Sequence, residues 1–429
     1  MKTTIEHFKS FSKTPRCSFD ARKMRDFIIE FAASIGYTAK VDKADNILCF
    51  KQKPLICLQS HYDMVCLGDA PNVAIYEKDG WMGAKNSTLG ADNGMGVALM
   101  MSMMERYENI ECLFTSDEEV GLIGANNLEH KITAPYLLNL DSEEEGAIFI
   151  GCAGGVDITG KISARKRSAR EGFKAFEISI KDLQGGHSGV DIDKNIPNAI
   201  KVLASEFTNS DCELVSINGG ERINSIPKSA SAIFYAPKNF TPKNRSVIIK
   251  EIKKDDDVLA RSSDILQMIQ NFVQGVRSFN DELKIPHESI NLSTIKTDDK
   301  EVTVEFFARA MEKKALEDLG ESTSDFLKNF GFDVKIEGFS APWKPNVTPF
   351  AKKLQKITRK FFKNAEFKAI HAGLECGIFE NINPNIEIAS IGPNIKFPHS
   401  LNECCEIASV ERLEIVLKEL MADLERACE

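Results

Sequence analysis

Short apolar runs alternate with helical segments throughout the first third of the chain, and this rhythm restricts the folds that it can adopt. The strand-like runs are NILCFK, PLICLQS, IECLFTS, YLLNLD and AIFIGCAGG. Residues 94–107 (GMGVALMMSMMERY) are apolar on nearly every side, which is typical of a helix buried against a sheet. Residues 117–128 (DEEVGLIGANNL) indicate another helix, with acidic residues in its first turn. The alternation predicts an α/β fold in which helices flank a mixed sheet.

The length of 429 residues is too great for one ordinary hydrophobic core and predicts two or three domains. From about Gly155 the pattern changes to alternating polar strands and longer, charged helices, as in an α+β domain. After Trp343 it returns to a long helix, a strand and a final amphipathic helix. We therefore expect one α/β domain, made of residues 1–155 and 340–429, interrupted by an inserted α+β lid domain, residues 156–339.

The composition argues against several classes of partner. A net charge of −9 disfavours nucleic acid and anionic membranes as partners. No window approaches eighteen consecutive apolar residues, and the N-terminus MKTTIEHFKSFSK lacks the apolar core of a secretory signal. The eleven cysteines are scattered without a CxxC pair. Together these features predict a cytoplasmic protein with reduced thiols and no membrane association.

Acidic and imidazole side chains occur where the strand-like runs end. His61 and Asp63 follow PLICLQS and, being two residues apart in an extended chain, they point to the same face. The other residues in comparable positions are Asp92 in TLGADNG, Asp117, Glu118 and Glu119 after IECLFTS, Asp141 after YLLNL, and His399 after the predicted insertion. Ligands of open α/β sheets bind beyond the carboxyl ends of the strands. We therefore expect these side chains to meet at one edge of the sheet.

Each of these residues, taken alone, has a simpler explanation. An isolated Asp at a strand end is commonly a helix N-cap, and Glu118 and Glu119 could be favourable first-turn charges. His399 alone could be a surface residue or a hydrogen-bonded filler. Several carboxylates and two imidazoles, however, do not lie at close range without a compensating cation. Imidazole with carboxylate and no thiolate suits zinc, manganese or cobalt.

A set of five ligands that shares one carboxylate could hold two ions. Their separation would be about 3.5–4 Å, which is the spacing in hydrolases that use two metals together. Such ions lower the pKa of a bridging water and polarise a carbonyl group. A carboxylate that binds neither ion must then take the proton of the water, and Glu118, next to Glu119, fits that role.

Seven motifs follow one another along the chain. They are HYDMV, TLGADNG, FTSDEEVG, LNLDSEE, GGHSG, HAGLECG and IGPNIKFPHS. In this order they resemble the two-metal zinc dipeptidases related to aminoacylase, carnosinase and carboxypeptidase G, and most of all the bacterial aminoacyl-histidine dipeptidases (peptidase D). The resemblance covers nearly the whole chain, from PRCSFD to the last helix. Single motifs of this kind are weak, but the ordered set is specific.

The resemblance implies a role for each clustered residue. The five implied metal ligands are Asp92 as the bridge, Glu119 and His399 at one ion, and His61 and Asp141 at the other. Asp63 would orient and polarise His61. Glu118 would act as general base and later as general acid toward the leaving amine. The implied cofactors are two divalent ions, zinc above all, with cobalt or manganese as alternatives.

Further positions are expected to bind the substrate. His187 in GGHSG would help to hold the carbonyl oxygen as it becomes anionic, unless GGHSG is only a turn at a strand edge. Asn224 in NGGERINSIP matches an asparagine-containing stretch of the family. Arg309 in EFFARA would bind the carboxylate of the substrate, the alternative being a surface charge on a strand. Glu375 in HAGLECG would meet a free amino group or form a structural hydrogen bond, and His371 is expected to be structural.

The resemblance and the residues together predict a cytosolic metallo-dipeptidase. Its expected substrates are Xaa-His dipeptides or a broader range of dipeptides, bound between the α/β domain and the lid. One alternative is an aminoacylase-like or carboxypeptidase-like amide hydrolase on the same metal site. Another is a non-catalytic binding protein, which would lack Glu118 or a ligand. A homodimer through the lid is expected, so His187 would serve its own site or the site of a neighbour.

Overall fold

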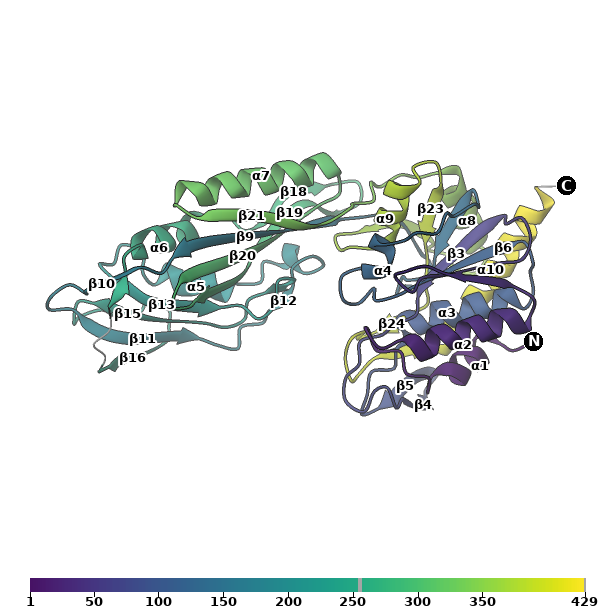
Figure 1. Ribbon diagram of the computed structural model, residues 1–429, viewed down its shortest axis with the longest axis horizontal. Coiled ribbons are helices and arrows are strands. Elements are labelled where there is room, and N and C mark those ends of the chain that lie inside the picture. The colour runs from purple at the N-terminus through teal and green to yellow at the C-terminus, as the bar shows by residue number, and fades with distance from the viewer. Residues whose placement is uncertain (254–256, 428–429) are drawn as a thin grey trace. The chain divides into compact units, whose positions relative to one another are not determined.

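The computed structural model describes residues 1–253 and 257–427, and these form two compact units (Figure 1). Unit 1 consists of Met1–Gly151, Pro345–Ala369 and the residues from Leu374 onward, and unit 2 consists of Cys152–Lys344 and Ile370–Gly373. Both ends of the chain lie in unit 1, so unit 2 is an insertion into it. The predicted fold class, a mixed α/β sheet with helices and an additional inserted domain, is confirmed.

The main sheet of unit 1 has the strand order β1–β2–β6–β3–β7–β23–β8–β22. The bounds of these strands are β1 Thr38–Val41, β2 Ile47–Phe50, β6 Ile110–Thr115, β3 Ile56–His61, β7 Tyr136–Asn139, β23 Glu387–Ser390, β8 Ala147–Cys152 and β22 Glu366–Ile370. The four strands β6, β3, β7 and β23 are mutually parallel. On one side of them β2 pairs antiparallel with β6, and β1 pairs antiparallel with β2. On the other side β8 pairs antiparallel with β23. The carboxyl ends of the parallel strands therefore meet at one edge, where α/β sheets bind ligands.

Helices cover this sheet. Their bounds are α1 Thr4–Phe11, α2 Arg22–Ser34, α3 Ala91–Met104, α4 Ile123–Asn126, α8 Pro349–Thr358, α9 Glu375–Ile382 and α10 Ile407–Arg426. Every residue of α3 except Asp92 is buried, as its continuous apolar sequence predicts, and α3 packs against β3 and α1. Its methionines belong to the hydrophobic core of unit 1. The rigid interior thus holds the first turn of α3 in place beside the end of β3.

The predicted helix at residues 117–128 is wrong for most of its length, because α4 covers only Ile123–Asn126. Asp117 (φ 48°), Gly121 (φ 110°) and Leu122 (φ 58°) adopt left-handed backbone conformations, which interrupt a right-handed helix. The acidic residues after β6 therefore lie in a turn. Their place is consequently set by tertiary contacts rather than by a helix dipole.

A small second sheet of unit 1 has the order β24–β25–β5–β4. Its strands are β24 Ile395–Lys396, β25 Cys404–Glu406, β5 Trp81–Lys85 and β4 Ala74–Lys78. The connection between β24 and β25 carries His399. This sheet therefore returns a C-terminal segment of the chain to the N-terminal part of the fold.

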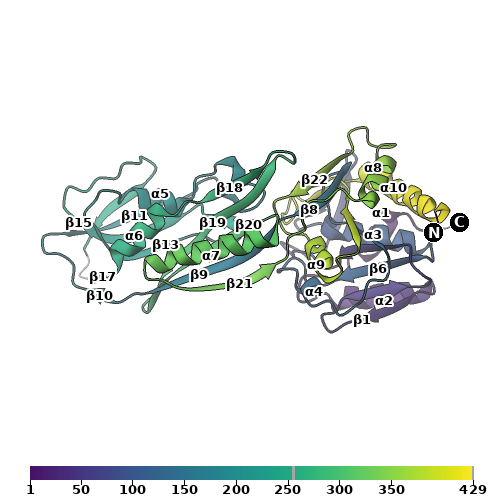
Figure 2. The same ribbon diagram turned by 90° about the horizontal axis from the view of Figure 1, so that it is seen from above.

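Unit 2 contains a large sheet in which β16, β11, β15, β13, β19, β20, β9 and β21 follow one another, with β18 paired to β19. The bounds are β16 Ile248–Ile252, β11 Lys174–Ile180, β15 Ala230–Ala236, β13 Glu213–Gly219, β19 Ile285–Thr297, β20 Glu301–Ala310, β9 Gly154–Ser163, β21 Asp333–Ser340 and β18 Gly275–Asn280. The helices α5 (Ala199–Ser205), α6 (Ser262–Asn271) and α7 (Lys313–Asn329) share one hydrophobic core with it. Figure 2 shows α7 lying along β9 and β21.

Among the described residues, one pair of cysteines departs from the expectation of reduced thiols. Cys17 and Cys66 form a disulfide, with their Cα atoms 5.5 Å apart, so the prediction of reduced thiols is wrong for this pair. The two cysteines lie 49 residues apart and in no CxxC motif, so no local pattern indicated that they pair. Throughout the described part of the chain, no helix is both long and apolar enough to cross a bilayer.

Candidate active site

The carboxyl edge of the main sheet brings together the acidic and imidazole residues of unit 1. His61 is the last residue of β3, Asp141 follows β7 by two residues, and Glu118 and Glu119 lie in the turn after β6. Asp92 lies in the first turn of α3, where its ψ of 110° departs from helical geometry. His399 reaches the same place from the β24–β25 loop. The sequence therefore predicts the convergence of these side chains correctly, whereas Asp117, expected at the same edge, accepts the backbone N–H of Phe19 at 2.6 Å and is absent from the groups of close donor atoms among the described residues.

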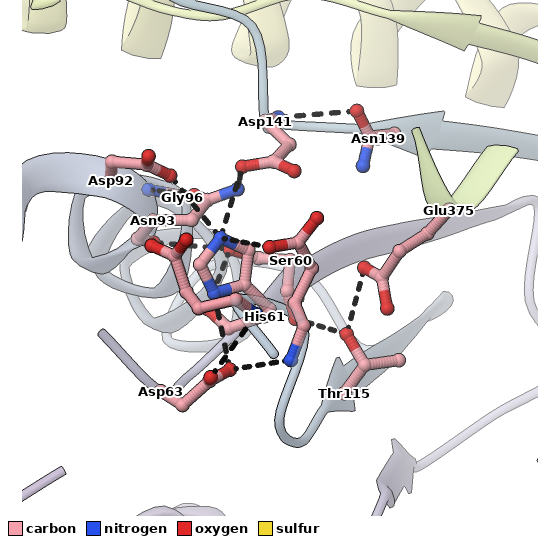
Figure 3. Close-up of polar contacts among 12 residues, drawn as sticks. Ser60, His61, Asp63, Asp92, Asn93, Gly96, Thr115, Asn139, Asp141 and Glu375 are labelled. Carbon is pink, nitrogen blue, oxygen red and sulfur yellow. Dashed lines mark hydrogen bonds and ion pairs between the residues drawn. The ribbon is translucent and has the colours of Figure 1, made fainter. Parts of the chain in front are cut away.

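The ring of His61 lies between carboxylates (Figure 3). Its Nε2 atom is 3.2 Å from Oδ1 of Asp92 and 3.4 Å from Oδ1 of Asp141. On the other side of the ring, Nδ1 is 3.3 Å from Oδ1 of Asp63. Both ring nitrogens therefore face carboxylate oxygens, and Asp63 fixes the orientation in which Nε2 points toward Asp92 and Asp141.

Asp92 is shared between the two histidines. While its Oδ1 faces His61, its Oδ2 lies 3.0 Å from Nε2 of His399. The same nitrogen of His399 is 2.8 Å from Oε2 of Glu119. The three side chains His61, Asp92 and Asp141 can present ligand atoms within 4.8 Å of one another, and so can Asp92, Glu119 and His399. Asp92 is thus common to two adjacent groups of donor atoms.

The donor set fits divalent transition metals. Imidazole nitrogen and carboxylate oxygen without thiolate are the ligands that zinc, manganese and cobalt accept. Oε1 of Glu119 is buried and, among the described residues, has no hydrogen-bond partner. A buried carboxylate oxygen without a donor is costly unless a cation satisfies it. The residues of this edge could therefore hold two cations, with Asp92 between them.

The charges and the burial of the clustered side chains shift their pKa values. Hydrogen bonds to Asp92 and Glu119 raise the pKa of His399 to about 11. Burial opposes protonation of His61, yet the carboxylates of Asp141, Asp63 and Asp92 raise its pKa well above the usual value. Burial is also the main reason why the pKa of Glu118 is raised. In the absence of a metal, protons on the imidazoles therefore balance part of the negative charge.

Asp63 also organises the turn after β6. Its Oδ1 accepts the backbone N–H of Glu118 at 3.0 Å and its Oδ2 accepts that of Glu119 at 3.4 Å. The hydroxyl of Ser18 donates to Oδ2 at 2.7 Å. The side chain of Glu118 thereby lies with its Oε2 3.9 Å from Nε2 of His61. With His61 and Glu119 it forms a third group of close donor atoms, but it belongs to neither group that shares Asp92.

The model of the family described as Peptidase family M20/M25/M40 matches residues 57–423. The chain belongs to this family. It is 29% identical to the cytosol non-specific dipeptidase of Escherichia coli (strain K12), over 97% of this chain and 96% of the relative.

Solved structures share the fold of this chain. Aminoacylhistidine dipeptidase from Vibrio alginolyticus superposes on this M20-family chain with a TM-score of 0.81 and 27% identity, over 99% of this chain and 96% of that one. A tripeptidase from Staphylococcus aureus subsp. aureus Mu50 shares the fold, with a TM-score of 0.61, 16% identity and coverage of 99% of this chain and 98% of that one.

Glu375 lies beside the metal-binding edge of this M20-family protein. Its side chain is fully buried, and its Oε2 accepts a hydrogen bond from Gln59 Nε2 at 2.5 Å. The same oxygen accepts a hydrogen bond from Thr115 Oγ1 at 2.9 Å (Figure 3). Its Oε1 is buried and has no hydrogen-bond partner among the described residues. Burial raises the pKa of Glu375 to about 7. Glu375 therefore forms the structural hydrogen bonds that were one expectation for it. Its Oε1 is still available to bind a free amino group, which was the other expectation.

The substrate-binding candidates of unit 2 have different environments. Nδ1 of His187 accepts the N–H groups of Gly189 and Val190, both at 3.2 Å. Arg309 is buried, with its guanidinium 4.4 Å from the ring centre of Phe307, and burial lowers its pKa to about 10. The alternative of a surface charge at Arg309 is therefore wrong. Asn224 is exposed.

The last glycine of GGHSG, Gly189, lies where a larger residue does not fit. A Cβ atom there would collide with the carbonyl oxygen of His371 and would lie 3.0 Å from the His187 ring and 3.1 Å from Nε of Arg309. Only glycine allows the backbone to approach these three groups so closely. His371 is buried, and its Nε2 lies 2.7 Å from Oγ of Ser289, in agreement with a structural role.

Sequence reasoning did not single out Asn93, which contacts Asp141, or Gln59, which contacts Glu375. Nδ2 of Asn93 donates to Oδ1 of Asp141, and Oδ1 of Asn93 accepts the N–H of Gly96 at 3.0 Å. Gln59 joins Glu375 to Asn139, whose Nδ2 donates to Oε1 of Gln59 at 2.6 Å. The available signals were the position of Asn93 inside TLGADNG and a polar Gln59 within the apolar run PLICLQS.

Proposed function

We propose that this M20-family protein is a metal-dependent dipeptidase. The observation that carries the proposal is the position of Asp92, whose two oxygens face His61 and His399 while Glu118 lies next to the same cluster. The relatives from Escherichia coli and Vibrio alginolyticus are dipeptidases by name, and they match this chain over nearly their whole length. The reaction is hydrolysis of the amide bond between two amino acids.

In this proposal, the five metal ligands are His61, Asp92, Glu119, Asp141 and His399. When bound, two divalent cations would lower the pKa of a water and polarise the carbonyl group that is attacked. Asp63 holds the His61 ring in the orientation needed for ligation. The carboxylate of Glu118 takes the proton of the attacking water and later gives it to the leaving amine.

Four residues are proposed to bind the dipeptide. The Arg309 guanidinium would pair with the terminal carboxylate, since its planar fork matches two carboxylate oxygens. Glu375 would meet the free amino group. His187 would donate to the carbonyl oxygen as negative charge develops on it, and Asn224 would assist binding. Support for Arg309 and Glu375 comes from their burial, which strengthens a charged contact.

The proposed substrates are Xaa-His dipeptides together with other dipeptides. The Vibrio alginolyticus relative, named an aminoacylhistidine dipeptidase, supports the first, and the Escherichia coli relative, named non-specific, supports the second. We further propose zinc as the cation, a cytoplasmic location and a homodimer formed through unit 2. The proposed catalytic domain, residues 1–155 and 340–429, and the proposed inserted domain, residues 156–339, differ from the two compact units by a few residues at each boundary and at Ile370–Gly373.

The test is hydrolysis of a dipeptide panel by protein treated with chelator, with and without added Zn²⁺, Co²⁺ or Mn²⁺. Each dipeptide is compared with its N-acetyl and its C-terminal amide derivative. We expect activity only with metal, and only on dipeptides with both charged ends free. Activity that survives complete metal removal would contradict the mechanism. A preference for N-acyl substrates would instead indicate the aminoacylase-like alternative.

A further inference from the structure

The loop that carries His399 has little regular structure of its own to hold it. It connects β24 to β25, and both Phe397 (φ 54°) and His399 (φ 55°) adopt left-handed backbone conformations. The His399 side chain is 50% exposed. At the far end of the same loop, in contrast, Glu403 is buried, with only 4% of its surface exposed. The loop is therefore anchored at Glu403 rather than at the histidine.

The carboxylate of Glu403 accepts four consecutive backbone N–H groups. Oε2 accepts those of Leu89 and Gly90 at 2.8 and 2.9 Å. Oε1 accepts those of Ala91 and Asp92 at 2.7 and 3.3 Å. Hydrogen bonds to a charged acceptor are among the stronger ones in proteins, and a negative charge is favourable at the N-terminus of a helix such as α3. One buried side chain thus fixes the whole turn that ends in Asp92.

The guanidinium of Arg16 holds the same turn by donating to the carbonyl group of Gly90. Its Nη2 donates to the carbonyl oxygen of Gly90 at 2.5 Å, and its Nη1 donates to that of Asp63 at 3.4 Å. A Cβ atom at Gly90 would collide with the guanidinium, and one at Gly94 would lie 2.6 Å from it. The turn is therefore fixed from two sides and is joined to the segment that contains Asp63.

We infer that Glu403 is a positioning residue that couples two metal ligands, because it ties the His399 loop directly to the backbone of Asp92. This inference rests on the proposed function, in which Asp92 and His399 bind the same ion. With the Glu403 contacts in place, both ligands keep their positions before a metal arrives, so little ordering remains for the metal to impose. Without them, the direct contact of 3.0 Å between Asp92 and the half-exposed side chain of His399 would have to hold the loop against the turn.

The test compares Glu403→Gln with Glu111→Gln. Glutamine has the size of glutamate but replaces one accepting oxygen with a donor, which would face backbone N–H groups. Glu111 is a matched control, since it is also buried and accepts the N–H groups of Thr133 and Ala134, at 2.8 and 2.7 Å, away from the metal-binding edge. Dissociation constants for Zn²⁺ are measured by competition with a chromophoric chelator, and the thermal stability of the metal-free proteins is measured in parallel.

We expect both variants to lose thermal stability, but only Glu403→Gln to bind at least one Zn²⁺ ion more weakly, by about 10- to 100-fold. Equal Zn²⁺ affinity in Glu403→Gln and the wild type would overturn the inference, and so would an equal loss of affinity in Glu111→Gln. If wild-type protein binds two ions and cleaves dipeptides while Glu403→Gln retains its affinity, the inference alone fails. The proposed function would then stand.

Hydrogen exchange keeps the inference testable if the variant does not fold. In wild-type protein without metal, the amides of Leu89, Gly90, Ala91 and Asp92 should exchange slowly, because Glu403 already binds them. Exchange as fast as in the exposed loop around His399, which slows only after Zn²⁺ is added, would show that the metal and not Glu403 orders the turn. That outcome would overturn the inference.

Discussion

Oδ1 of Asp63 lies 3.3 Å from Nδ1 of His61 and accepts the backbone N–H of Glu118 at 3.0 Å. One buried carboxylate therefore sets the orientation of an imidazole and the position of the turn that carries the candidate base. The site consequently depends on a residue that does not face the proposed ions. Contacts that orient a ligand from behind, as Asp63 does for His61, are the reason why ligand types alone do not define a metal site.

Replacement of Asp63 by asparagine should weaken metal binding by about 10- to 100-fold, because the amide does not carry the negative charge that holds and polarises His61. Zn²⁺ dissociation constants provide the measurement. Asp42→Asn is the control, since Asp42 also accepts backbone N–H groups, those of Ala44 and Asn46, but at a different turn. Unchanged Zn²⁺ affinity in Asp63→Asn would refute the role.

Replacement of Glu118 by glutamine should leave two metal ions bound and reduce kcat by about 10²- to 10⁴-fold, because the amide has no basic oxygen to accept the proton of the water. Metal content by elemental analysis and kcat with a cleaved dipeptide are the measurements. Glu129→Gln, at an exposed glutamate paired with Lys43, should retain full activity. A fully active Glu118→Gln would remove Glu118 as the base.

Metal binding should release protons. The pKa of His399 is about 11 in the metal-free protein, so its imidazole is protonated near pH 7, whereas ligation requires the neutral form. Affinity should therefore fall as the pH is lowered, by about tenfold per pH unit for each proton released. Calorimetric titration with Zn²⁺ in buffers of different ionisation enthalpy counts these protons. A heat of binding that is independent of the buffer would contradict the prediction.

Replacement of Glu375 by glutamine should raise KM for dipeptides with a free amino group by about tenfold or more, because a charged hydrogen bond to the ammonium group is lost. The amide can still accept hydrogen bonds from Gln59 and Thr115, so folding should be preserved. Steady-state kinetics on a dipeptide and on its desamino analogue provide the comparison. If KM rises equally for both substrates, Glu375 is structural only.

Local sequence patterns predicted much of the fold. The continuous apolar character of residues 94–107 indicated a buried helix, and α3 is buried at every position except Asp92. The runs PLICLQS and IECLFTS each indicated a strand, and they form β3 and β6, which the structure shows to be parallel neighbours. The helix expected at 117–128 was wrong, since periodicity does not reveal left-handed residues such as Asp117 and Leu122.

Hydrophobic periodicity and the positions of strand ends are properties of neighbouring residues, so the sequence by itself determined the α/β class and the convergence of polar side chains at one edge. The tertiary structure decided which oxygen faces which nitrogen. His399 contacts Asp92 across 307 residues of chain, and Glu403 reaches the backbone of Leu89 across 314. Such contacts depend on how packed layers place loops, and no local pattern encodes that placement.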